Sequence, residues 1–193
     1  WIAEDPDSKS KILASTSGIV VDIIDHPLPH PSGAFGPCIV IEPDRRDEAI
    51  SRPLPPFSEE PANPESLLDE LESLGVTGLG GAAFPTRKKL DPGATPIETV
   101  ILNGAECEPL IACDEALMQE RSSLIVEGAR DLLRLTSAKK VLIAVESNKT
   151  HAIHQLRQAL ASSTHPAITL VLVPPIYPQG GEKQLIQTLT GME

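Results

Sequence analysis

The sequence has few cysteines, no long apolar run and no excess of positive charge. Its three cysteines, Cys38, Cys107 and Cys113, are too few for a disulfide framework, and no run reaches the ~18 apolar residues that cross a bilayer. A formal net charge of −11 over 193 residues argues against nucleic acid or an anionic membrane surface as the main partner. A soluble protein of a reducing, cytoplasmic compartment fits best.

Several catalytic signatures are also missing. The segment 78–90, GLGGAAFPTRKKL, is not a Walker loop, because Ala82-Ala83 stand where Lys and Ser/Thr would be required. It also lacks the third glycine of the dinucleotide fingerprint and follows an expected helix instead of a strand. No HExxH motif or nucleophile elbow occurs, and the cysteine spacing is not that of zinc or iron-sulfur ligands. We therefore expect no metal here, no hydrolytic chemistry, and buried thiols at Cys107 and Cys113.

The N-terminal part has the pattern of a small β module. Short strands are expected within 11–25, broken at Ser17-Gly18, and at 38–42. A proline-rich linker, 51–64, separates this module, 1–50, from a second domain, 65–193. The chain opens at Trp1 without an initiator methionine or a signal sequence, so we expect a fragment in which the β module is incomplete.

The second domain alternates helices and strands. Asn63, Pro64 and Gly75 mark the ends of a helix with an apolar leucine stripe. Beyond it the sequence predicts strands at 98–104, 139–147 and 167–173, and helices at 114–135, 151–160 and 182–189. The fold class is therefore α/β, a Rossmann-like domain with a mostly parallel sheet covered on both faces.

Ligands of such sheets bind outside the carboxyl ends of the strands. Those ends lead into turns rich in Gly, Glu and Asn: 103–108 (NGAECE), 146–149 (ESNK) and 177–182 (YPQGGE). Together with the glycine-rich segment 78–90 they could line one crevice, in which glycines permit close approach and Arg87, Lys88 and Lys89 suit a phosphate. If their segment is extended, Glu106 and Glu108 share a face and could serve as acid and base or as acceptors for ribose hydroxyls; otherwise they are helix-entry acids before Asp114.

Four segments in order, GLGGAAFPTRKKL, NGAECEPLIACDEALMQE, VLIAVESNK and YPQGGEKQLI, resemble the C-subunit of the Rnf electron-transport complex. They resemble more distantly the NADH-binding flavoprotein subunit of respiratory complex I. The similarity runs from about Asp69 to Glu193, and the β segment before it resembles the N-terminal, barrel-sandwich region of the same Rnf protein.

The resemblance implies a module that binds FMN and NADH and takes part in electron transfer between NADH and ferredoxin, coupled to ion transport. It would sit peripherally at the cytoplasmic face of the bacterial inner membrane with the other Rnf subunits. Iron-sulfur clusters and a later flavin loop would lie beyond Glu193. No residue of the chain would act as a catalytic acid or base, because the cofactors exchange the hydride. The implied cofactor-binding residues are Gly78, Gly80, Gly81, Phe84, Lys89, Asn103, Glu106, Glu108, Tyr177, Gly180, Gly181 and Glu182.

The same resemblance assigns roles within that set. Lys89 would meet the FMN phosphate region, Phe84 would stack on the NADH adenine, and Asn103 and Glu106 would hold FMN. Compared with complex I, Leu79, Ala105 and Cys107 replace an arginine, an aspartate and a serine. Two alternatives therefore stay open: the related cobalamin reductase of propanediol-utilising microcompartments, and a docking module that keeps the fold and binds no cofactor.

Overall fold

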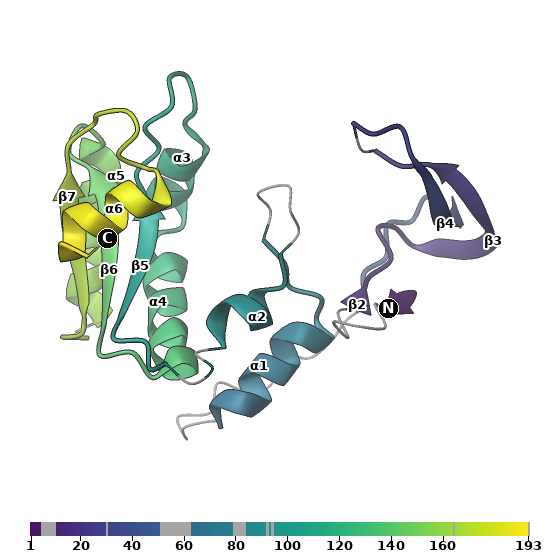
Figure 1. Ribbon diagram of the computed structural model, residues 1–193, viewed down its shortest axis with the longest axis horizontal. Helices are drawn as coiled ribbons and strands as arrows, with labels where there is room; N and C mark the ends of the chain where they lie inside the picture. The colour runs from purple at the N-terminus through teal and green to yellow at the C-terminus, as the bar shows by residue number, and fades with distance from the viewer. Residues whose placement is uncertain are drawn as a thin grey trace.

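The structure, a computed structural model of the chain, describes residues 1–4, 11–29, 31–50, 63–78, 84–91, 93, 95–163 and 165–192. Figure 1 shows a β hairpin, a helical segment and an α/β unit one after another along the long axis. Most of the expected linker, 51–62, lies outside the described residues, so the domain boundary stays a prediction.

The N-terminal residues form two small antiparallel sheets. Strand β1 (Ala3–Glu4) pairs with β2 (Lys11–Ile12), and β3 (Gly18–Pro27) pairs with β4 (Phe35–Pro43). The predicted strands and the break before Gly18 are confirmed, but β3 and β4 are longer than expected. They run into the proline-containing segment between them and leave 28–34 as the connection. A closed barrel-sandwich is not seen among the described residues and remains a prediction.

Helix α1 (Pro64–Ser73) begins and ends where its sequence signals lie. Asn63 Oδ1 accepts from the backbone N–H of Glu65, Pro64 occupies the first turn, and Gly75 follows the helix with φ of 63°. Leu68 of the leucine stripe is buried. The short helix α2 (Thr86–Leu90) comes next and was not expected from the sequence.

The α/β unit is built on a three-stranded parallel sheet in the order β5-β6-β7. These strands are β5 (Thr99–Gly104), β6 (Lys140–Glu146) and β7 (Ile168–Val173), with Leu102 opposite Ile143 and Ile143 opposite Leu170. Helices α4 (Ser122–Thr136) and α5 (Thr150–Ser163) pack on one face with Val141, Ile143 and Val145. Helix α6 (Glu182–Thr190) covers the other face through Leu185. The predicted α/β class, parallel sheet and two-sided cover are confirmed.

The expected single helix over 114–135 is wrong, because the segment forms two helices. Helix α3 (Cys113–Glu120) ends at Arg121, whose φ of −129° and ψ of 26° are not helical, and α4 starts at Ser122. Ser122 and Ser123 favour a helix start over a helix interior. The break lets α3 pack on α5 while α4 runs along the sheet.

Candidate site at the carboxyl edge of the sheet

The turns after β5 and β7 are hydrogen-bonded to each other. Asn103 Nδ2 donates to the Gly180 carbonyl at 2.8 Å, and the Gly180 N–H donates to Cys107 Sγ at 3.3 Å. A Cβ at position 180 would stand 2.1 Å from the Ala105 carbonyl oxygen, so only glycine allows this approach. The first and third of the predicted turns therefore meet, and Asn103 is engaged in holding them together.

These turns enclose a recess of about 390 Å³. It opens at the edge predicted for ligand binding, outside the carboxyl ends of the strands. Among the described residues its walls carry three carboxylates and no lysine or arginine. The lining residues are Asn103, Ala105, Glu106, Cys107, Glu108, Ile111, Asp114, Tyr177, Pro178, Gly180 and Gly181.

Glu106 is fixed at the start of α3. Its side chain is 2% exposed, and its two carboxylate oxygens accept from the backbone N–H groups of Asp114 at 2.7 Å and Glu115 at 3.3 Å. Burial raises the pKa of Glu106, but these hydrogen bonds, one from the Cys113 thiol and the charge of Lys149 outweigh it, so the pKa lies below its ordinary value. Glu106 is thus an ionised helix-entry acid, the second of the two sequence-based alternatives.

The segment around Cys107 turns instead of extending. The backbone N–H of Glu108 donates to the Glu106 carbonyl, and the side chain of Glu108 is exposed whereas that of Glu106 is buried. The two glutamates therefore do not share a face. The expectation of buried thiols is also wrong, because Cys107 is half-buried and Cys113 exposed. Cys113 is the first residue of α3 and lies exposed at that end of the helix.

The glycine-rich segment is closed at its base. The N–H of Gly78 donates to the Phe84 carbonyl at 2.9 Å and the N–H of Thr86 to the Val76 carbonyl at 3.1 Å. Gly80 and Gly81 lie outside the described residues. Among those that are described, Gly78, Phe84 and Lys89 do not line the recess, and neither does Glu182 at the start of α6. Their cofactor roles stay predictions.

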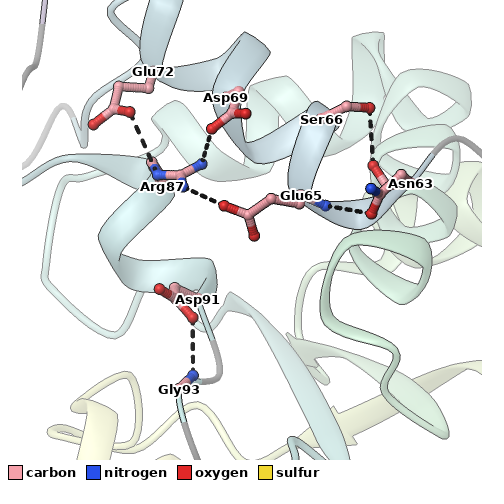
Figure 2. A network of polar contacts seen from close by, with 8 residues as sticks. All are labelled: Asn63, Glu65, Ser66, Asp69, Glu72, Arg87, Asp91 and Gly93. Atoms are coloured by element: carbon pink, nitrogen blue, oxygen red, sulfur yellow. Dashed lines mark hydrogen bonds and ion pairs between the residues drawn. The ribbon is translucent and has the colours of Figure 1, made fainter.

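Arg87 is bound to three carboxylates of α1 (Figure 2). Its Nη2 lies 2.6 Å from Glu65 Oε1, its Nη1 lies 2.7 Å from Asp69 Oδ1 without hydrogen-bond geometry, and its Nε lies 3.4 Å from Glu72 Oε2. The hydrogen bond to Glu65 contributes most to raising the pKa of Arg87. Arg87 therefore ties α2 to α1, whereas the neighbouring Lys88 and Lys89 are exposed.

Lys149 is a site residue that sequence reasoning did not assign, although the segment that contains it, VLIAVESNK, was among the four motifs. Its Nζ lies 2.7 Å from Glu115 Oε2 and 3.5 Å from Glu106 Oε2. The second predicted turn is thereby joined to the first through α3. The sequence signal that could have identified Lys149 as a site residue was its position in the turn after β6, the central strand of the sheet.

The fold and the recess define a class: a parallel α/β domain with a polar crevice at the carboxyl edge of its sheet, typical of nucleotide-cofactor binding. Within it, the chain belongs to the family described as the Nuo51 FMN-binding domain, whose profile matches residues 71–193. Among the described residues no helix is both long enough and apolar enough to span a membrane.

Named relatives and solved structures agree with this family. The chain is 45% identical over 183 residues to the C-subunit of the ion-translocating oxidoreductase complex of Edwardsiella ictaluri and 44% identical to that of Pasteurella multocida. Each alignment covers 94% of this chain but only 22% and 21% of the relatives, so the chain spans about a fifth of their length. An NAD⁺-reducing [NiFe]-hydrogenase in its H₂-reduced state is 27% identical, with a TM-score of 0.59 over 68% of this chain and 25% of the hydrogenase chain.

Proposed function

We propose that this chain is the FMN- and NADH-binding part of the C-subunit of an Rnf-type complex, an oxidoreductase that transfers electrons between NADH and ferredoxin and couples the transfer to ion transport. The observation that carries the proposal is the match of residues 71–193 to the FMN-binding domain family. The α/β part of this segment contains the recess between the turns after β5 and β7. The names of the relatives indicate the complex to which we assign the chain.

The chemistry of the recess fits part of a flavin nucleotide. Its carboxylates and the Gly180 and Gly181 backbone suit ribityl hydroxyls and N–H donors, which need acceptors and close approach. A phosphate needs a cation, which the described lining does not supply, so Lys89 and the loop amides at Gly80 and Gly81 would hold it. Phe84, Glu108, Tyr177 and Glu182 would bind NADH and close the crevice. FMN, when bound, accepts a hydride from NADH and releases single electrons.

The remaining parts of the system belong to the longer protein. We place the iron-sulfur clusters and ferredoxin contacts outside this chain, with the complex at the cytoplasmic face of the inner membrane. The β3–β4 hairpin exposes Ile19, Ile23 and Phe35, which is unfavourable for an isolated two-stranded sheet, and so we infer that it belongs to a larger, barrel-sandwich module. The relatives' names do not favour a cobalamin reductase.

Titration of FMN, followed by its fluorescence, tests the proposal. We expect saturable binding, bleaching of the flavin band on addition of NADH, and loss of binding in Gly80→Val. Gly128→Ala is the matched glycine control, because a Cβ at 128 meets nothing within 4 Å. Equal FMN affinity of Gly80→Val and the wild type would count against the proposal, and the absence of binding even in the full-length protein would favour a docking module.

A further inference from the structure

Lys149 joins three elements at the recess. It stands in the turn between β6 and α5, and its ammonium reaches Glu115 on α3 at 2.7 Å and Glu106 in the β5–α3 turn at 3.5 Å. The Lys149 side chain is only 13% exposed, so this ion pair is shielded from solvent. Removal of one partner of such a shielded pair is costly, because it leaves the other charge without compensation.

The charges around Lys149 make its role specific. Glu106, Glu108 and Asp114 line the recess, and Glu115 lies just behind Glu106. The three lining carboxylates present negative charge to a cofactor that carries a phosphate, and among the described lining residues no cation offsets them. Lys149 is the described cation in direct contact with this group. Its removal would leave Glu106 buried beside Glu115 with only backbone N–H and thiol donors.

We propose that Lys149 is a positioning residue of the cofactor site: its ammonium, 3.5 Å from Glu106 Oε2, holds that carboxylate against the start of α3 and lowers the repulsion between the recess and an anionic cofactor. This inference rests on the proposed function. Lys149 does not line the recess, so it acts through Glu106 and α3 and not by touching the cofactor.

Two measurements on Lys149→Met and Lys149→Arg test the inference. The first is the dissociation constant of FMN, which we expect to rise about tenfold or more in Lys149→Met and to return towards the wild-type value in Lys149→Arg. The second is the Glu106 titration, followed by the carboxyl carbon signal, whose midpoint should rise in Lys149→Met because the neighbouring positive charge is gone. A purely structural role would not predict that rise together with rescue by arginine.

Lys139→Met is the matched control. Lys139 pairs with Glu98 at the same 2.7 Å, but its side chain is 78% exposed and it lies just before β6, at the opposite end of that strand. We expect FMN affinity in this variant within about twofold of the wild type.

The outcomes separate the two proposals. An unchanged Glu106 titration in Lys149→Met overturns the inference whatever FMN does. A raised titration midpoint with unchanged FMN affinity, or equal losses in Lys149→Met and Lys139→Met, overturns the cofactor part. If the wild-type chain and the full-length protein both fail to bind FMN, the proposed function fails, and the Glu106 titration still decides whether Lys149 acts on that carboxylate.

Discussion

Asn103 Nδ2 donates a hydrogen bond of 2.8 Å to the carbonyl of Gly180, 77 residues later in the chain. This bond and the one from the Gly180 N–H to Cys107 tie together two turns that leave the same edge of the sheet. The recess exists because these turns are held side by side. Asn103 therefore shapes the site before any ligand contacts it.

Replacement of Gly180 by alanine should separate these turns. The new Cβ would face the Ala105 carbonyl oxygen at 2.1 Å, so we expect a loss of about 1–3 kcal/mol in the free energy of unfolding. Urea unfolding followed by circular dichroism measures it. Gly128→Ala, inside α4, should instead stabilise by up to about 1 kcal/mol, and a loss there equal to that of Gly180→Ala would contradict the assignment to crowding.

Glu106 should make stability depend on pH. Its folded-state pKa lies below the ordinary value of 4.5, so its contribution is present above that value and is lost as the pH falls through the folded-state pKa. We expect Glu106→Gln to cost about 2 kcal/mol at pH 7 and progressively less towards pH 3. Unfolding free energies of both proteins between pH 3 and 7, in about half-unit steps, test this dependence. A constant difference across the range would contradict it.

Asp114 should show the opposite sign. Asp114 is exposed, but partial desolvation and then the charge of Glu106 raise its pKa, so its ionisation costs more in the folded chain than in the unfolded chain. Asp114→Asn is expected to stabilise the chain by a few tenths of a kcal/mol at pH 7, an effect that should vanish below about pH 4. Destabilisation at neutral pH would show instead that the favourable interaction of the Asp114 charge with the start of α3 outweighs the cost of ionising this side chain.

Arg87 should set the stability of the α1–α2 pair. Arg87→Gln leaves Glu65, Asp69 and Glu72 without their common cation, and we expect a loss of about 1 kcal/mol at low salt. Because Glu65 and Asp69 are well exposed, the loss should shrink in about 1 M NaCl, where the Debye length is about 3 Å. Hydrogen exchange of the α1 amides locates the effect. A salt-independent loss would point to packing.

The sequence predicts helix α1 and the parallel sheet well because their signals are local. Asn63, Pro64 and Gly75 carry the chemistry of a helix start and end, and β6 is a continuous apolar run. The break at Arg121 was missed because its local signal, Ser122 and Ser123, is weak beside the helical pattern on both sides, and the packing of α3 on α5 and of α4 on the sheet decides where the chain bends.

The site was predictable at the level of its turns but not of its contacts. The carboxyl-edge rule brings 103–108 and 177–181 together, as observed. It cannot say that Arg87 is already paired with α1 or that Lys149 reaches Glu106, because those partners are distant in sequence. Sequence patterns identify which residues could bind a ligand, and the fold decides which of them are already occupied.

The strands β5, β6 and β7 are neighbours both in the chain and in the sheet. Both strand pairings of the α/β unit are therefore possible once Val173 has emerged from the ribosome. Each pairing joins two strands that are separated in the chain by a single crossover connection. This unit can assemble in the order of its synthesis, and α6 then completes the second face. A nascent chain in which Thr190 has left the ribosomal exit tunnel should already resist protease over β5, β6 and β7.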